Sequence, residues 1–216
     1  LKNTVSLAIL VSGNDTGIGK TVASAFLAHR LSSVGSTCYV KPIETGSAEP
    51  LDATYVNARN ESLEVHTLLN FRQPLAPVEA AKMDGKELDF SELVSRARSF
   101  SEESENLVIE GAGGLATPID EKGLDWLDFA KNLPVDYLIL VIENRLGVLN
   151  QARLLASHLG DCAIPCGLWL NETRSLDAIT RSANEQGLSR EILPVWATQR
   201  HGNLDPVESS FPWEQA

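Results

Sequence analysis

Short apolar runs rich in β-branched residues alternate along the chain with longer segments of helical periodicity. The predicted strands are Ser6–Ser12, Thr37–Lys41, Leu107–Glu110, Tyr137–Ile142, Ile164–Leu170 and Ile192–Trp196. The predicted helices are Gly19–Val34, a segment marked by Phe90, Leu93, Val94 and Ala97, a segment marked by Val148, Ala152, Leu155 and Leu159, and Ser175–Gly187. Strands that alternate with helices in this way predict an α/β three-layer sandwich, with a mostly parallel sheet and helices on both faces.

Two segments interrupt this alternation and are interpreted as loops, namely Glu44–Leu51 and the proline-containing Asn70–Pro77. Excursions of this kind often carry substrate contacts. The chain has 216 residues without an internal repeat, a low-complexity linker or a sharp change in composition. That length suits one sizeable domain and is short for two, so a single domain over residues 1–216 is expected.

The charge of the chain limits its partners. A formal net charge of −11 argues against sequence-independent binding to nucleic acid and against binding to an anionic membrane, because both need a basic face. No apolar run approaches the ~20 residues of a membrane helix. The start, Leu1–Thr4, is too short and polar for a signal peptide. We expect a soluble, cytoplasmic protein.

Cysteine and histidine usage gives no sign of a disulfide framework or of a structural metal. The odd number of cysteines, Cys38, Cys162 and Cys166, suits a reducing cytosol. Cys162 and Cys166 resemble half of a zinc site, but no second pair of ligands follows. The four histidines lack the spacing of metal ligands, and they are His29, His66, His158 and His201.

The segment Gly13–Thr21, with the sequence GNDTGIGKT, lies between the first predicted strand and a helix. Glycines in this position let backbone N–H groups converge on phosphates, and the helix N-terminus adds positive potential. Lys20 is expected to reach the β- and γ-phosphates of a nucleotide, and the Thr21 hydroxyl is expected to bind magnesium. The generic pattern has its first glycine where Asn14 stands. An ordinary glycine-rich turn is the alternative, and the position between strand and helix counts against it.

Two classes of nucleotide-binding protein fit this loop poorly. A GTPase usually shows a guanine-reading Asn-Lys-x-Asp, which the sequence does not contain. Partition and division-site ATPases carry a second lysine at the place that Asp15 occupies here. A regulatory ATPase that acts with DNA or a membrane is therefore the less favoured alternative.

Four motifs in order resemble the dethiobiotin synthetase family of P-loop enzymes. Gly13–Thr21 is similar to the family's Gly-Thr-Asp-Thr-x-Val-Gly-Lys-Thr, and Lys41–Gly46 resembles its Lys-Pro-Val-x-Thr/Ser-Gly. Glu110–Gly114 is identical to its Glu-Gly-Ala-Gly-Gly and is followed by Thr-Pro-Ile, as in relatives. Leu146–Gln151 approximates Leu-Gly-x-Ile-Asn-His, with glutamine in place of the histidine. The motifs extend over about half of the chain.

The resemblance implies a P-loop fold and an ATP-dependent ligase that joins CO2 to 7,8-diaminononanoate and closes the ureido ring of dethiobiotin. In the implied mechanism a substrate carbamate attacks the γ-phosphate, and the second amine then displaces phosphate from a carbamic–phosphoric anhydride. Such phosphoryl transfer depends mainly on positioning and charge neutralisation. A ligase that acts on another small substrate stays as an alternative, because Gln151 departs from the family pattern.

The resemblance also assigns roles to individual residues. Lys41 and Lys20 are implied as catalytic, and Thr21, Asp52 and Glu110 as the magnesium ligands, a set of oxygen donors that magnesium prefers. The implied substrate contacts are Thr45, Gly147, Leu149 and Asn150. The implied nucleotide contacts are Thr16, Gly17, Ile18, Gly19, Lys20, Thr21, Val22, Asp52, Glu110, Gly111, Ala112, Gly113, Asn171, Glu172, Pro194, Val195 and Trp196.

Within that set, Asn171 is implied to read the adenine, and Pro194–Trp196 to pack near the base. The helix that begins near Gly147 has free N–H groups suited to a carboxylate, and in the family the neighbouring subunit supplies it. A homodimer with shared sites is therefore expected. The structural alternatives are a solvated strand-end lysine at Lys41, a turn-capping carboxylate at Glu110 and a solvated helix-start aspartate at Asp52.

Overall fold

The computed structural model describes residues 7–214, so the predicted strand start at Ser6 and the polar segment Leu1–Thr4 lie outside the described residues. The strands are β1 (Leu7–Gly13), β2 (Thr37–Thr45), β3 (Glu64–Phe71), β4 (Asn106–Glu110), β5 (Tyr137–Glu143), β6 (Cys166–Asn171), β7 (Val195–Gln199) and β8 (Glu208–Ser209). The helices are α1 (Lys20–Leu31), α2 (Leu51–Arg59), α3 (Pro77–Met83), α4 (Phe90–Glu103), α5 (Trp126–Asn132), α6 (Val148–Leu159) and α7 (Ala178–Leu188), with a short 3-10 helix at Pro212–Glu214.

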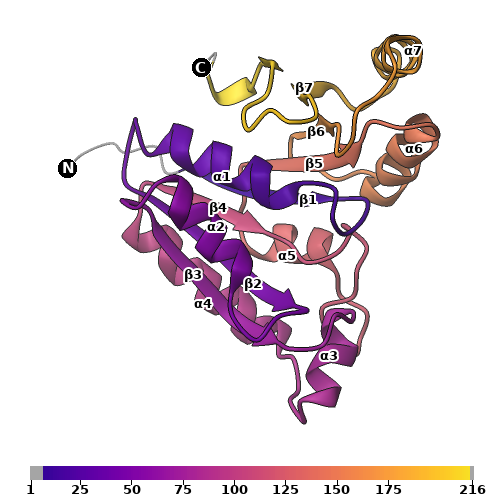
Figure 1. Cartoon of the computed structure of the whole chain (residues 1–216). Helices are drawn as coiled ribbons and strands as arrows, with labels where there is room; N and C mark the ends of the chain where they lie inside the picture. Colours follow the sequence, from indigo (N-terminus) through magenta and orange to yellow (C-terminus); the bar gives the residue numbers. More distant parts are fainter. Residues whose placement is uncertain (1–6, 215–216) are drawn as a thin grey trace.

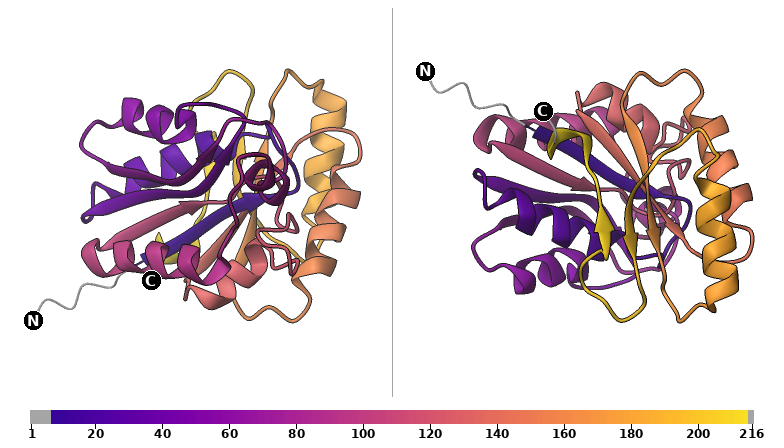
Figure 2. Two further views of the ribbon diagram at one scale, coloured as in Figure 1. Left: turned by 90° about the horizontal axis from the view of Figure 1, so that it is seen from below. Right: turned by 90° about the horizontal axis from the view of Figure 1, so that it is seen from above.

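The eight strands form one sheet in the order β3-β2-β4-β1-β5-β6-β7-β8, and only the short β8 runs antiparallel to its neighbour (Figure 1). The prediction of a mostly parallel sheet is confirmed. Helices α1 and α2 cover one face of the sheet, and α3 to α6 pack on the other (Figure 2). The fold is therefore the expected three-layer sandwich.

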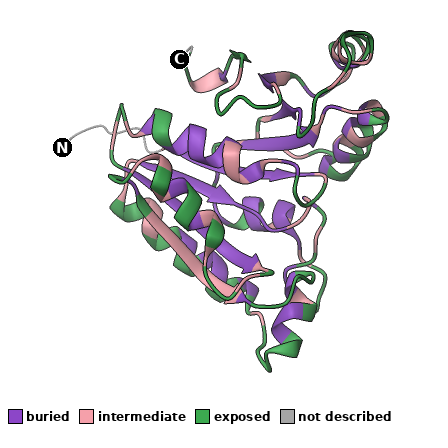
Figure 3. Ribbon diagram, in the orientation of Figure 1, coloured by how far each residue is buried: buried purple, intermediate pink, exposed green. Residues whose placement is uncertain are grey.

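Each face of the sheet has its own apolar core, because successive side chains of a strand point to opposite faces. In β1, Leu10 packs toward α3–α6, whereas Ile9 packs toward α1 and α2. Both side chains are fully buried. Burial is nearly continuous along the central strands and only partial along β3 at the edge (Figure 3). Strands covered on both faces read as unbroken apolar runs, and this is why the sequence reveals the central strands most clearly.

Parallel strands bring their carboxyl ends to one edge of the sheet. The residues at these ends are Gly13 of β1, Thr45 of β2, Glu110 of β4, Glu143 of β5, Asn171 of β6 and Gln199 of β7. Ligands of open α/β sheets bind beyond this edge. Gly13–Thr21 and Glu110–Gly114 begin at these residues, and Lys41–Gly46 ends next to Thr45, so the fold brings three of the four sequence motifs together.

Several strands differ from their predicted positions. β2 continues to Thr45, beyond the predicted end at Lys41 and into the segment interpreted as the loop Glu44–Leu51. β3 was not predicted, and it runs into the segment interpreted as the loop Asn70–Pro77, because its half-exposed residues give no continuous buried run. The last parallel strand is Val195–Gln199 and not Ile192–Trp196. Ile192 is 88% exposed, whereas the polar Thr198 and Gln199 are buried in the sheet. The prediction, which relied on apolar character alone, therefore placed this strand three residues too early.

Helices α2, α3 and α5 were also not predicted, because nine or fewer residues give little helical periodicity. α2 begins at Leu51, the last residue of the segment that was interpreted as a loop. Within the part of the chain that the structure describes, no helix has the length and apolar character needed to cross a membrane.

Candidate active site

The phosphate loop connects the buried strand β1 to α1. Gly19 lies at the N-terminus of α1 with φ 96°, a left-handed conformation that favours glycine. A Cβ atom at this position would lie 2.2 Å from Nδ2 of Asn171, so the close packing also requires glycine. The Asn171 amide donates a hydrogen bond of 2.8 Å to the carbonyl oxygen of Ile18. The end of β6 therefore holds the loop against the start of α1, whose first N–H groups are suited to phosphate.

The Lys20 side chain folds back over this loop. Its Nζ donates to the carbonyl oxygen of Asp15 at 2.5 Å, and the side chain is buried. Burial lowers the pKa of Lys20 to about 8, although Glu110, Asp52 and Asp15 act in the opposite direction. The ammonium group is thus poorly solvated and stands inside the loop, where an incoming phosphate would compensate its charge.

A cluster of four side chains lies directly beyond Lys20. The Thr21 hydroxyl lies 3.0 Å from Oδ1 of Asp52 and 3.0 Å from Oε1 of Glu110. Lys41 Nζ donates to Asp52 Oδ2 at 2.7 Å and to Glu110 Oε1 at 2.6 Å, and it lies 3.4 Å from the carbonyl oxygen of Gly111. α1, α2, β2 and β4 each contribute one member, so the cluster exists only in the folded chain.

The ionic groups in this cluster stabilise one another. Burial would lower the pKa of Lys41, but the nearby carboxylates of Glu110 and Asp52 outweigh it and raise that pKa. The hydroxyl of Tyr39 donates to Oε2 of Glu110 at 2.9 Å, and burial, together with Glu110, raises the pKa of Tyr39 well above its usual range. Tyr39 therefore keeps its proton and acts as a fixed hydrogen-bond donor.

Thr21, Asp52 and Glu110 present a hydroxyl and two carboxylates to one another, as expected of a magnesium site. Their oxygens are hard ligands, and in the structure Lys41 offsets part of the negative charge of the two carboxylates. The chemistry of the donor set thus fits a magnesium ion bound together with phosphate oxygens. The alternatives of a solvated lysine at Lys41 and a solvated aspartate at Asp52 do not agree with these contacts.

Two adjoining cavities open beside the cluster. The smaller, about 310 Å³, is lined by Lys20, Thr21, Lys41, Asp52 and Glu110 together with loop residues. The larger, about 940 Å³, extends from the phosphate loop to the start of α6. Both cavities are lined by Thr16, Thr45, Ala112 and Gly113. The phosphate-binding elements thus face a space of the size that holds a small-molecule substrate.

The start of α6 borders the larger cavity through Asn150 and Gln151. The Gln151 side-chain oxygen is buried and has no hydrogen-bond partner among the described residues. Gly147 precedes α6 with φ 95°, and Leu149 packs against Gly187 of α7. Of the implied substrate contacts, the structure brings Thr45 and Asn150 to the cavity, whereas Leu149 faces another helix.

The turn after β4 fits tightly between the phosphate loop and α5. The Leu115 amide donates to the carbonyl oxygen of Gly13 at 2.6 Å. Trp126 Nε1 donates to the carbonyl oxygen of Ala112 at 2.7 Å, and a Cβ atom at Gly111 would lie 3.0 Å from the indole. The Glu-Gly-Ala-Gly-Gly segment is therefore held by its backbone, with Trp126 as a support.

Several implied nucleotide contacts lie elsewhere. Pro194 precedes β7, and Val195 and Trp196 are its first two residues, whereas the site lies beyond the carboxyl ends of the strands. The Trp196 ring packs edge-on to Tyr137, at the start of β5, and covers Gly167. The structure thus does not bring this segment to the phosphate loop. The resemblance alone placed this segment near the base, and the strand itself was predicted three residues too early.

Glu172 follows β6 directly, but its carboxylate is already engaged. Arg181 binds it at 2.6 Å and Arg200 at 2.9 Å. Burial opposes the charge of Glu172, and the two arginines outweigh burial and lower its pKa. Glu172 acts in the structure as the centre of an ion-pair network. Arg200, which follows β7 at the carboxyl edge, was missed in the sequence.

Two further residues of the site were not predicted. Tyr39 precedes Lys41 by two positions on the same strand face, and this alternation was the available signal. Glu44 Oε1 accepts from the backbone N–H groups of Leu51 at 2.7 Å and Asp52 at 3.1 Å. It thereby caps α2, where Pro50 has no suitable side chain, and fixes the start of the helix that carries Asp52.

Comparisons with known proteins agree with these motifs. A family model described as an AAA domain matches residues 8–191. ATP-dependent dethiobiotin synthetase BioD of Methanococcus vannielii is 37% identical over 155 residues, which cover 70% of this chain and 72% of that protein. The protein of the same name from Xanthomonas axonopodis pv. citri is 33% identical and covers 90% of this chain and 96% of its own length. The protein of the same name from Mycobacteroides abscessus is 31% identical, over 90% of this chain and 87% of that protein.

Solved structures with the same fold are more distant in sequence. The signal recognition particle receptor FtsY from Elizabethkingia anophelis has a TM-score of 0.60 at 16% identity, over 97% of this chain and 65% of that one. A ParA family ATPase from Chlorobium tepidum TLS has a TM-score of 0.56 at 15% identity, over 93% of this chain and 86% of that one. At these identities the likeness concerns the fold alone, and it confirms the P-loop NTPase-like architecture.

Proposed function

Because the chain belongs to the dethiobiotin synthetase family, we propose that it closes the ureido ring of dethiobiotin from 7,8-diaminononanoate and CO2 at the expense of ATP. The observation that carries this proposal is the contact between Thr21, Lys41, Asp52 and Glu110. These side chains lie between the phosphate loop and a cavity that takes a small molecule. A ligase needs this juxtaposition of phosphate and acceptor.

The reaction begins when one amine of the diamine adds to CO2 and loses a proton, which gives a carbamate. A carbamate oxygen attacks the γ-phosphorus, and the bond to the β-phosphate oxygen breaks, which releases ADP. The second amine then attacks the carbonyl carbon of the mixed anhydride, loses a proton and displaces phosphate. Lys20 and the N–H groups at the start of α1 would hold the β- and γ-phosphates, and Lys41 would stabilise the charge that develops on the transferred group.

Thr21, Asp52 and Glu110 would hold a magnesium ion. When bound, magnesium neutralises phosphate charge and orients the triphosphate for in-line transfer. Glu44 supports this arrangement through the N-terminus of α2, and Tyr39 fixes the Glu110 carboxylate from the other side. Lys41 would then be free to face the phosphate and the carbamate.

We place the diamine in the larger cavity, with Thr45, Asn150 and Gln151 along its wall. The unpartnered carboxamide oxygen of Gln151 suits an N–H donor of the substrate. For the base of ATP, Asn171 and the residues after β7, including Arg200, lie at the appropriate edge of the sheet. The three cysteines form no disulfide, as is typical of a protein that acts in a reducing cytoplasm.

We further propose that two copies of the chain pair through the region of α6. Leu146 and Leu154 are 85% and 62% exposed, and both lie close to the residues that border the larger cavity. Large apolar side chains exposed next to a site are typical of an interface. The expected result is a homodimer by light scattering, converted to monomer by Leu154→Glu; a monomeric wild type would refute this arrangement.

The test of the proposed function is coupled turnover. ADP should form from ATP only when diaminononanoate and bicarbonate are both present, and dethiobiotin should appear in equal amount by mass spectrometry. Rapid ADP formation without the diamine would contradict the proposal. It would favour the regulatory ATPase, which the absence of a lysine at Asp15 speaks against.

A further inference from the structure

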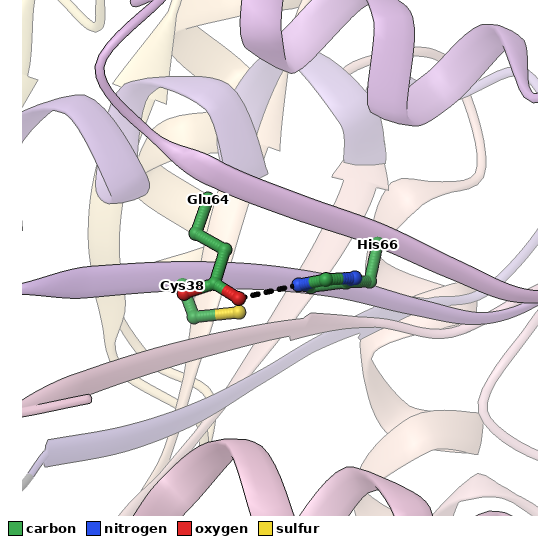
Figure 4. A group of neighbouring side chains, drawn as sticks. All are labelled: Cys38, Glu64 and His66. Atoms are coloured by element: carbon green, nitrogen blue, oxygen red, sulfur yellow. Dashed lines mark hydrogen bonds and ion pairs between the residues drawn. The ribbon is translucent and has the colours of Figure 1, made fainter. Parts of the chain in front are cut away.

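Three metal-ligating side chains of different chemistry meet on the edge of the sheet remote from the phosphate loop. Cys38 of β2 is paired with Glu64 of β3 in the parallel ladder, and His66 follows two residues later on the same face. The cysteine sulfur, a glutamate oxygen and a histidine nitrogen all lie within 4.8 Å of one another. Figure 4 shows the Glu64 carboxylate between the Cys38 sulfur and the His66 ring.

Helix α4 covers this group. The His66 ring packs on Phe100, with ring centroids 4.3 Å apart, and this contact fixes the imidazole next to Glu64. The two side chains meet at 2.7 Å from His66 Nε2 to Glu64 Oε1. The last turn of α4 holds Glu103 and no basic residue. Both the carbonyl end of the helix and this carboxylate favour a cation.

We propose that Cys38, Glu64 and His66 form a binding site for a zinc-type divalent cation. Thiolate, imidazole and carboxylate are the three ligand classes that zinc accepts, and three protein ligands leave one position for water or for the nearby Glu103. Magnesium disfavours sulfur, so this site differs in its preference from the oxygen site near Thr21. A bound cation would join the edge strand β3 to β2.

The thiol must lose its proton to serve as a ligand. Burial, with a smaller contribution from Glu64 and Glu103, raises the pKa of Cys38 to about 12, so the free protein keeps the thiol protonated. The cation would displace this proton to solvent, as it does at other cysteine sites. No zinc-type spacing is visible in the sequence, because Cys38 meets Glu64 and His66 across neighbouring strands and not along one segment.

This site is separate from the proposed active site. Cys38 packs toward α4, whereas Lys41 contacts Asp52 of α2 and Glu110 of β4 on the opposite face of the sheet. None of the three residues borders the two cavities near the phosphate loop. A change at Cys38 is therefore expected to leave ligase turnover intact, and the two proposals can fail independently.

The experiment titrates Co2+ into the whole chain, in excess Mg2+ so that the Thr21 site is occupied. We expect one equivalent of Co2+ to give a near-ultraviolet sulfur-to-cobalt charge-transfer band, and Zn2+ to remove it by competition. Cys38→Ser should abolish the band, and His66→Gln should weaken Co2+ binding by at least about tenfold. Cys166→Ser is the matched control and should keep the band.

Two results would overturn the proposal. One is the absence of a thiolate band in the wild type, and the other is a band that persists in Cys38→Ser but disappears in Cys166→Ser. If Cys38→Ser fails to fold, the proposal is tested with the variant His66→Gln. Unchanged Co2+ affinity in His66→Gln would exclude a metal site at Cys38, Glu64 and His66. Zn2+ should also raise the melting temperature of the wild type and not that of His66→Gln.

Discussion

At the residue scale, Lys41 uses its three N–H donors on three oxygen atoms, from Asp52, Glu110 and Gly111. An ammonium group has no further donor to offer. The lysine is thus fully engaged inside the protein, and its charge is what allows two carboxylates to lie together beside Thr21. Any substitution of this residue acts on the carboxylates as well as on the substrate.

Lys41→Met is expected to lower kcat by about 10²- to 10³-fold, because it removes a donor aimed at the charge that develops in phosphoryl transfer. It should also lower the stability of the magnesium-free protein by about 3–5 kcal/mol, because Glu110 is left buried without its cation. Steady-state kinetics and denaturant unfolding measure the two effects. Lys82→Met, at an exposed ion pair, is the control; wild-type turnover in Lys41→Met would contradict the assigned role.

The pKa of Lys20 predicts how nucleotide binding depends on pH. Burial lowers this pKa to about 8 in the free protein, and phosphate binds the protonated form. The apparent affinity for ATP should therefore fall as the pH rises through 8, by about tenfold between about pH 7 and about pH 9. Calorimetry with a non-hydrolysable ATP analogue measures this slope, and Lys20→Met should lose both affinity and slope. An affinity that is constant over this range argues against the contact.

The residues that the structure brings together around the phosphate loop were predictable, because each lies in a short motif at the end of a strand. Lys20, Thr21, Lys41 and Glu110 belong to this class, and their positions depend on local sequence. Asp52 was the harder case, since a loop separates it from Lys41. Partners that depend on long-range packing, such as Tyr39, could not be recognised from spacing alone.

At the element scale, short helices and edge strands decide the geometry of the site and are the parts that sequence patterns describe least well. α2 was not predicted, yet it carries Asp52. β3 was not predicted because an edge strand that is exposed on one side has no unbroken apolar run. The shift in β7 arose from polar residues that the sheet buries, and the base contacts implied by the resemblance lie at the start of that strand.

Glu44→Ala tests the connection between β2 and α2. The loss of two hydrogen bonds at the helix start should cost about 0.5–2 kcal/mol of stability and should lower turnover, because Asp52 loses its fixed position. Asp89→Ala removes the N-cap of α4, where Asp89 accepts from the Glu92 amide. This control should lose similar stability and keep full activity. Equal turnover in both variants would show that the cap serves folding alone.

At the scale of the whole molecule, one sheet connects every part of the described chain. β1 lies between β4 and β5, and the two apolar cores face each other across it. Because both cores share the same strands, neither is expected to melt alone. This continuity supports the proposal of a single domain, which the sequence suggested by its length and even composition.

Unfolding in urea should accordingly be a single transition. Tryptophan fluorescence and far-ultraviolet circular dichroism should give the same midpoint, since Trp126 and Trp169 report from opposite faces of the sheet. ATP with magnesium should move the whole transition to higher urea concentration, and Lys20→Met should remove this shift. Separate midpoints for the two probes would instead reveal two independently folding units.

The charge balance between two lysines and two carboxylates beside the phosphate loop has a consequence for how an acidic protein receives an anion. The ammonium groups of Lys20 and Lys41 lie near the carboxylates of Asp52 and Glu110, so these four groups together carry no net charge, although the chain as a whole carries −11. Lys41 can turn toward an incoming anion only when another positive charge takes over its carboxylates. We therefore expect an order of events in which the triphosphate is neutralised first and the Lys41 side chain becomes free for the carbamate afterwards.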